Sequence, residues 1–178
     1  MLLMTSLLCT ALEEDRLEQI DIEADEATFS ETQGLTTYSG NVILSQGSLE
    51  LRAQTMSIYQ TSEQQLKAVK AHGSSQSPVT MKQQVRSKEG NIEWVNARSE
   101  SIVYNMKLNQ VEFMGNADIK KGDATIQSEL IQYDANNGVF YASNTQNTDA
   151  SGSSSRVRIS LPPQPPKNDT QQPPKDTE

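Results

Sequence analysis

Three carboxylates, Asp21, Glu23 and Asp25, alternate along one short stretch of the sequence. On an extended strand this spacing places all three on one face, where two carboxylates could act as the acid and the base of a hydrolase. The solvated face of a strand shows the same alternation of charged residues. Because no further group completes an acid/base set, we expect a polar strand face and no catalytic residue.

Other residues that support chemistry are scarce. The chain has one histidine, His72, and one cysteine, Cys9. These numbers exclude zinc sites built from Cys and His, disulfides within the chain, and Ser-His or Cys-His catalysis that does not use His72. His72 precedes Gly73 and is interpreted as a turn residue. We therefore expect no enzyme activity, no metal and no cofactor.

The composition favours a thin or elongated β protein. The 178 residues include 15 Lys and Arg against 23 Asp and Glu, which gives a net charge of −8, and 34% of the residues are hydrophobic. A negative chain disfavours nucleic acid as a partner because phosphates repel it. So small a share of apolar residues makes a thick central core hard to build.

The two ends differ in composition from the rest of the chain. Residues 2–12 carry no charged side chain, are too few to span a bilayer, and resemble the apolar part of a secretory signal without its basic start. We interpret residues 1–11 as a signal-peptide remnant and expect export. Six of the seven prolines follow Leu161, and we expect residues 164–178 to form a disordered polar tail.

Between Ile20 and Ala142, apolar residues recur mainly at a spacing of two, as in Val42 and Leu44. This period predicts β-strands, here of four to seven residues, separated by breaks that contain glycine or polar residues. The stretch 156–161 alternates in the same way and predicts a last strand.

The sequence also repeats at an offset of 75 residues. Gly40-Asn41 aligns with Gly115-Asn116, and Gly47 aligns with Gly122. We interpret these glycines as turn residues, and the aligned strand positions agree in apolar character. Each unit is therefore predicted to be a set of β-hairpins whose apolar face is covered by its other half or by its neighbour.

Alternation across the strands gives one apolar and one polar face. Two such faces folded together would make a sandwich or jelly roll with a narrow apolar interior. The medium and small aliphatic residues at inward positions could close a tight core or leave a slot. The sequence leaves both possibilities open.

Two segments carry a family resemblance. The segment from Ile20 to Ala27 (IDIEADEA), followed by Tyr38 to Ala53 (YSGNVILSQGSLELRA), resembles the OstA-like family of periplasmic lipopolysaccharide-transport proteins. A second Gly-Asn segment and the stretch 156–161 extend the resemblance over residues 19–163. It implies an all-β fold, a slightly twisted open β-jelly roll built from repeated short antiparallel strands, and a periplasmic location.

The resemblance also implies a function. It predicts a carrier that holds the acyl chains of lipopolysaccharide along an apolar groove and bridges inner-membrane and outer-membrane complexes. The implied partners are lipopolysaccharide through its lipid A, an LptC-like inner-membrane subunit, the N-terminal domain of the outer-membrane LptD, and further copies of the chain stacked head to tail.

Matching the family's lipid-contact positions onto this sequence selects Ile20, Ile22, Met81, Tyr104 and Met106. We add four inward-facing residues as candidates for lipid binding, namely Phe29, Leu44, Leu51 and Phe113. These four would be core residues in any β-sandwich. The alternative function is therefore a structural β-repeat protein with a closed core and no lipid ligand.

Overall fold

Nearly all of the ordered elements are antiparallel strands. The computed structural model describes residues 10–11, 14–63, 65–87, 90–144 and 156–162. Two short 3-10 turns, η1 (Glu14–Leu17) and η2 (Glu31–Gln33), interrupt the strands. The strands are β1 (Thr10–Ala11), β2 (Asp21–Glu23), β3 (Glu26–Ser30), β4 (Leu35–Gln46), β5 (Leu49–Gln60), β6 (Leu66–His72), β7 (Val79–Arg86), β8 (Ile92–Ser99), β9 (Ser101–Asn105), β10 (Gln110–Lys121), β11 (Ala124–Asp134), β12 (Val139–Ser143) and β13 (Arg158–Ser160).

Four long strands, β4, β5, β10 and β11, bend and take part in two layers. Layer 1 contains β2, the C-terminal halves of β4 and β10, the N-terminal halves of β5 and β11, and β7, β8 and β13. Layer 2 contains the other halves of these four strands together with β3, β6, β9 and β12. The long strands have 11 or 12 residues, and are longer than the sequence predicts.

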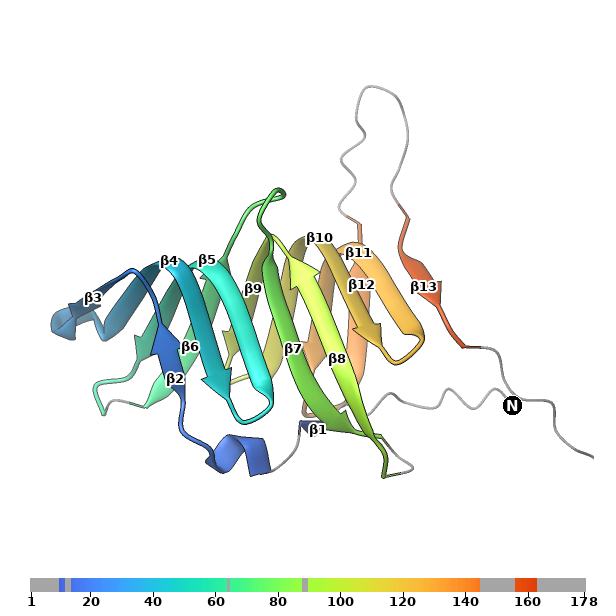
Figure 1. Cartoon of the computed structure of the whole chain (residues 1–178), viewed down its shortest axis with the longest axis horizontal. Coiled ribbons are helices and arrows are strands. Elements are labelled where there is room, and N and C mark those ends of the chain that lie inside the picture. Colours follow the sequence, from blue (N-terminus) through green and yellow to red (C-terminus); the bar gives the residue numbers. More distant parts are fainter. Residues whose placement is uncertain (1–9, 12–13, 64, 88–89, 145–155, 163–178) are drawn as a thin grey trace, which may run out of the picture.

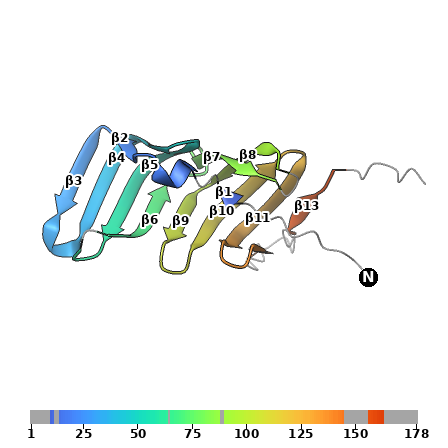
Figure 2. The ribbon, with the colours of Figure 1, turned by 90° about the horizontal axis from the view of Figure 1, so that it is seen from below.

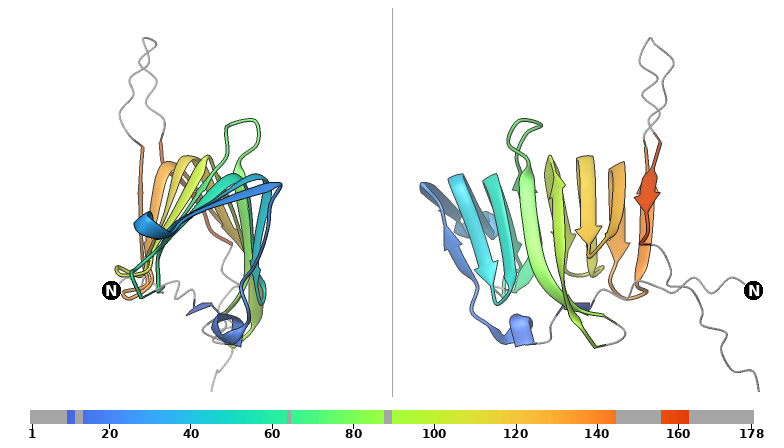
Figure 3. Two further views of the ribbon diagram at one scale, coloured as in Figure 1. Left: turned by 90° about the vertical axis from the view of Figure 1, so that its left-hand side faces the viewer. Right: turned by 45° about the vertical axis from the view of Figure 1, so that its right-hand side comes forward.

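The layers meet along the bends and diverge toward the opposite side, which we call the turn side because the β4–β5, β9–β10 and β10–β11 turns lie there (Figure 1). An end-on view shows this V-shaped section (Figure 3, left). Within each layer, the strands from β2 onward follow the order of the sequence along the long axis, from β3 at one end to β13 at the other, whereas β1 lies beside β7 near the middle (Figure 2). This arrangement is jelly-roll-like and confirms the predicted all-β fold class.

The pairing confirms the repeat. Strands β8 to β13 reproduce β2 to β7 in order. Ile22 pairs with Leu44 in the first unit as Ala97 pairs with Ile119 in the second. Each unit contributes strands to both layers, so each lines both sides of the interior.

The repeated Gly-Asn pairs are not turns between strands, as the sequence suggested, but lie inside β4 and β10. Gly40 and Asn41 have φ angles of 78° and 49°, and the register with β5 shifts between Ser39 and Val42. Such a β-bulge bends a strand sharply. Asp25 completes the bend: its backbone N–H donates to the Gly40 carbonyl at 3.0 Å, and its carboxylate accepts from the Asn41 amide at 2.9 Å.

The second unit contains the same set of hydrogen bonds across the bulge, which we call the clamp. Gly115 and Asn116 have φ angles of 77° and 46°, and Glu100 takes the place of Asp25. The Glu100 backbone N–H donates to the Gly115 carbonyl at 2.9 Å, and its carboxylate accepts from Asn116 at 3.1 Å. The bend therefore depends on two left-handed residues and a carboxylate from the connection between β2 and β3, or between β8 and β9.

The N-terminal segment is anchored on the turn side of layer 1. The buried Asp15 carboxylate accepts hydrogen bonds from the Ser48 backbone N–H at 3.0 Å and the Ser48 hydroxyl at 2.5 Å. The same hydroxyl accepts from the Gln84 N–H of β7 at 3.0 Å, and β1 pairs with the end of β7. Only Thr10 and Ala11 of the signal-peptide interpretation, and none of residues 164–178, lie within the described ranges. Across those ranges, no helix has the length and apolar character needed to cross a membrane.

Replacing Gly115 by alanine should lower the free energy of unfolding by about 3 kcal/mol, because the new Cβ adds a clash to the strain of a left-handed residue. That Cβ would lie 2.9 Å from Cβ of Glu100. Gly122→Ala is the matched control, since its φ is 55° and its Cβ would meet no atom within 4 Å; it should cost about 1 kcal/mol. Urea unfolding measures both, and equal losses would contradict the clamp.

Candidate functional site

The interior between the layers is lined by apolar side chains from both units. Its fully closed part lies near the bends, where Met56, Ile131, Val42 and Val79 have no measurable exposure. Burying such side chains contributes about 1.5–3 kcal/mol each. This part of the interior is a packed core.

A second set of inward residues lies in layer 2, two residues along each strand from the buried set and nearer the turn side. Most of its members are partly or largely exposed. We call it the turn-side row; it runs in register across eight strands and consists of Phe29, Thr36, Ile58, Val69, Tyr104, Val111, Tyr133 and Phe140. Only Val69 is buried. The Tyr133 and Phe140 rings stack with centroids 4.4 Å apart. The row is a mainly apolar surface that its own fold covers only in part.

The structure brings four of the predicted lipid-binding residues into one row of layer 1. Ile22 pairs with Leu44, Leu44 with Leu51, and Leu51 with Met81. Leu44 and Leu51 are each 7% exposed, whereas Ile22 and Met81 are half-buried and pack against the core.

The other five predicted residues are more dispersed. Phe113 is buried and Tyr104 is half-buried, both on the inner face of layer 2. Phe29 lies on edge strand β3 and is 61% exposed. Ile20 precedes β2, and Met106 lies in the β9–β10 turn; both are exposed.

Six members of the turn-side row were not among the predicted lipid-binding residues, and four of these six are apolar or aromatic and partly exposed. Ile58, Val111, Tyr133 and Phe140 occupy the same row as Tyr104. The alternating pattern of β5, β10, β11 and β12 marks these positions as inward. It does not reveal which inward positions stay partly exposed, because that depends on how the layers diverge.

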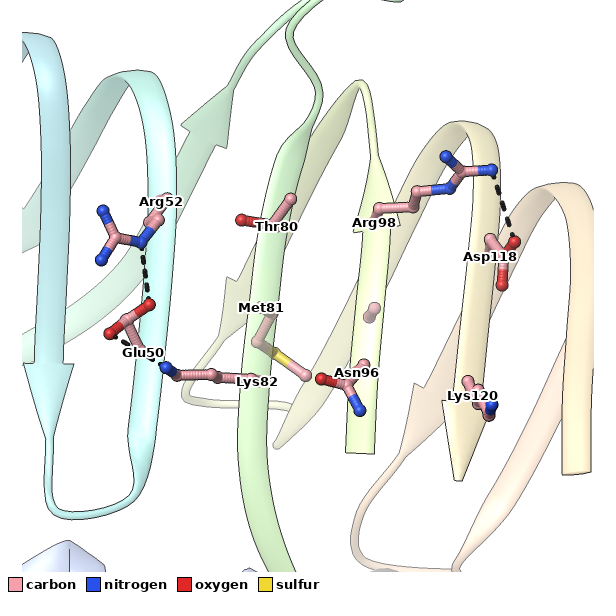
Figure 4. A pocket seen from close by; sticks show the side chains of 10 residues that line it. Glu50, Arg52, Thr80, Met81, Lys82, Asn96, Arg98, Asp118 and Lys120 are labelled. Atoms are coloured by element: carbon pink, nitrogen blue, oxygen red, sulfur yellow. Dashed lines mark hydrogen bonds and ion pairs between the residues drawn. The ribbon is translucent and has the colours of Figure 1, made fainter. Parts of the chain in front are cut away.

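The central part of the outer face of layer 1 is polar. A shallow depression there crosses β5, β7, β8 and β10 (Figure 4). Glu50 contacts Arg52 at 2.8 Å and Lys82 at 3.3 Å, and Arg98 contacts Asp118 at 3.6 Å. The hydrogen bond from Arg52, aided by Lys82, lowers the pKa of Glu50.

Exposed ion pairs of this kind contribute little to stability, but they make the depression itself unsuitable for an apolar ligand. Met81 borders the depression as well as the core. Ile92 and Trp94 are exposed on the outer face of β8, with 47% and 44% exposure, whereas the apolar row that runs in register across several strands lies on the inner face of layer 2.

The three carboxylates considered for catalysis serve other purposes. Asp21 and Glu23 are exposed on edge strand β2, where Asp21 accepts from the Gln19 amide at 2.7 Å. Asp25 bonds to Asn41 in the first clamp. His72 lies at the exposed end of β6.

Exposed apolar residues also mark the two ends of the long axis. Ile20 and Phe29 lie at the β2–β3 end, with 44% and 61% exposure. Ile159 and Leu161 lie at the β13 end, with 60% and 71% exposure. Among the described residues, β2 and β3 at one end and β12 and β13 at the other each pair on one side only, so both ends present unpaired strand edges.

Residues 21–139 match the family model described as "LptA/(LptD N-terminal domain) LPS transport protein". The match spans both structural repeats up to the start of β12.

Two curated proteins are similar in sequence. The lipopolysaccharide export system protein LptH of Pseudomonas aeruginosa is 27% identical over 166 residues, which cover 91% of this chain and 88% of LptH. The lipopolysaccharide export system protein LptA of Haemophilus influenzae is 28% identical over 126 residues, which cover 70% and 69% of the two chains.

The fold is similar to a solved structure. The crystal structure of LptH from Pseudomonas aeruginosa, described as the LptA homologous periplasmic component of the conserved lipopolysaccharide transport device, superposes with a TM-score of 0.68. Sequence identity is 23%, and the match covers 84% of this chain and 99% of that one. At this identity the likeness establishes the fold.

Proposed function

This chain belongs to the LptA/(LptD N-terminal domain) family of lipopolysaccharide transport proteins, and we propose that it carries lipopolysaccharide across the periplasm by binding the acyl chains of lipid A between its two layers. The carrier performs no catalysis. The observation that carries the proposal is the turn-side row, a mainly apolar surface that runs in register across neighbouring strands and stays partly exposed.

A carrier of lipopolysaccharide must offset a large free-energy cost of exposing acyl chains to water. Exposing an acyl chain to water costs about 0.8 kcal/mol per CH₂, or about 10 kcal/mol for a chain of a dozen carbons. Side chains such as Ile58, Val111 and Phe140 offer apolar contacts, which are non-directional. A lipid can therefore slide along the row without breaking specific bonds, while its sugars and phosphates stay in water on the turn side.

The nine predicted lipid-binding residues contribute differently in this proposal. Ile22, Met81 and Tyr104 are half-buried and could contact a lipid directly. The buried residues Leu44, Leu51 and Phe113 would do so only if the layers moved apart. Ile20, Phe29 and Met106 are exposed at the end and on the turn side, where a lipid would enter or leave.

The carrier is proposed to stack head to tail, and the internal repeat supplies a register for the junction. The two units of one chain join through β7–β8 and β6–β9. In the second unit β13 takes the place of β7, because Ile159 pairs with Ile126 as Met81 pairs with Leu51. A second copy could therefore add its β2 and β3 to β13 and β12 and repeat the internal junction.

In that register, complementary residues meet. Ile159 would face Ile22 and Leu161 would face Ile20 on the inner side. Arg158 would face Glu23 on the outer side, and Phe140 would face Phe29 in the turn-side row. Opposite charges and apolar pairs across strands each contribute about 0.2–1 kcal/mol. The turn-side row would continue from one copy into the next.

The same edges are proposed to bind the carrier's neighbours at the two membranes. The family model includes the N-terminal domain of LptD as well as LptA, so an outer-membrane partner with the same strand edges could continue the layers. An LptC-like inner-membrane subunit would bind the opposite end. The apolar residues 2–12, which lack charge, support export to the periplasm.

Ile22→Asp should lower the capture of purified lipopolysaccharide at least tenfold, because it places a charge among the apolar inward residues. Ile43→Asp is the matched control: Ile43 pairs with Glu23 and Arg52 and lies on the outer face of layer 1. Circular dichroism should show both variants folded. Equal capture by both, or unfolding of Ile22→Asp alone, would favour the closed structural repeat.

Reversing one charge of the proposed junction should weaken self-association about fivefold, because like charges would then face each other. Arg158→Glu and Glu23→Arg should each shorten the oligomers seen by sedimentation velocity at low salt. The double variant, which carries both substitutions in one chain (the double exchange), should form oligomers of the original length. Lys120→Glu, on the outer face away from the edges, is the control. Failure of the double exchange to restore length would reject this register.

A further inference from the structure

A chain of polar side chains runs from Tyr104 of β9 through Asn109 of the β9–β10 turn to Asn136 of the β11–β12 turn, beside the apolar turn-side row. The Tyr104 hydroxyl donates to Oδ1 of Asn109 at 3.1 Å. Nδ2 of Asn109 donates to Oδ1 of Asn136 at 3.0 Å, and Nδ2 of Asn136 donates to the Leu108 carbonyl at 3.0 Å. All three bonds run in one direction, away from Tyr104.

This direction fixes the chemistry of the Tyr104 oxygen. Because its proton is committed to Asn109, the oxygen presents only its lone pairs to other groups. Hydrogen bonds in series polarise one another, so this oxygen is a stronger acceptor than that of an isolated phenol. Its best partner is a neutral N–H or O–H donor.

The turn itself does not require these side chains, because the first unit builds the same turn without them. Gly34 stands where Asn109 stands in the second unit, with φ of 56° against 50°. Gln60 N–H donates to the Gly34 carbonyl at 2.7 Å as Ala135 N–H donates to the Asn109 carbonyl at 3.0 Å. Phe29 takes the place of Tyr104 and has no hydroxyl. The polar chain is therefore an addition specific to the second unit.

The surroundings are apolar on one side and open on the other. Tyr104 pairs across the sheet with Val69 and Val111 and packs against the core. In the adjoining turn, Met106 and Leu108 are 37% and 53% exposed. A tyrosine with an apolar body and a polar tip suits the boundary between an apolar layer and water.

Resting on the carrier function proposed above, we propose that Tyr104, held by Asn109 and Asn136, is a subsite that accepts a hydrogen bond from the amide N–H joining an acyl chain to a sugar headgroup. The acyl chain lies along Val111 and the turn-side row, and the sugar projects past Met106 toward water. Asn109 and Asn136 are positioning residues, since they act through the Tyr104 hydroxyl. The subsite sets the depth to which such a lipid enters.

The test compares two probes, N-dodecanoyl glucosamine and its N-methylated amide, in which a methyl group replaces the donor proton. Each displaces bound fluorescent lipopolysaccharide from the full chain. The wild-type protein should bind the N–H probe about fivefold more tightly, as one neutral hydrogen bond allows. Tyr104→Phe should reduce this ratio to about one and leave the affinity for the methylated probe unchanged.

Two further variants separate the subsite from general effects. Asn109→Gly copies the turn of the first unit, so the fold should persist. The ratio of the affinity for the N–H probe to that for the methylated probe should fall. Tyr59→Phe is the matched control, because Tyr59 pairs with Leu35 and Ala68 outside the turn-side row and lies under Lys70; its ratio should match wild type. Equal affinity of wild type for both probes, or a ratio unchanged by Tyr104→Phe, overturns the subsite and leaves the carrier standing. If neither probe displaces bound lipopolysaccharide, the subsite is overturned and the carrier stands; if the wild-type chain captures no fluorescent lipopolysaccharide at all, the carrier function fails too.

Discussion

The bend in the long strands is the constraint on which this molecule depends. At Gly40-Asn41 and at Gly115-Asn116, two left-handed residues turn one strand from layer 1 into layer 2, and Asp25 or Glu100 bonds to the asparagine at the bend. Since each bent strand belongs to both layers, the layers are joined along the bends and free on the turn side. The apolar interior is thus closed at its base and accessible along its length.

This geometry explains how a chain with few apolar residues can both fold and offer a binding surface. Near the bends, residues such as Met56 and Ile131 are fully buried and stabilise the sheet. Toward the turns the layers diverge, and the row containing Ile58, Tyr104 and Phe140 is only partly covered. Because the strands run in sequence order along the axis, the row reaches both ends, and a further copy or a related domain could extend it.

Much of this could be predicted from the sequence, because period and repeat are local properties. The spacing of Val42 and Leu44 predicted strands, and the offset between Gly40-Asn41 and Gly115-Asn116 predicted two equivalent units. The role of those glycines was predicted wrongly as a turn, since a bulge and a turn use the same left-handed residues. The exposure of Phe29 and the polar chain from Tyr104 could not be predicted, because both depend on contacts between distant strands.

The most direct test of an internal lipid surface uses neighbouring residues of β5 that face opposite sides. A photo-crosslinking side chain at Ile58 lies in the turn-side row, whereas one at Ser57 shares the outer face with Thr37 and Lys70. With purified lipopolysaccharide, the account predicts a lipid adduct at position 58 and none at position 57. Adducts at both positions, or none at position 58 in the folded protein, would contradict it.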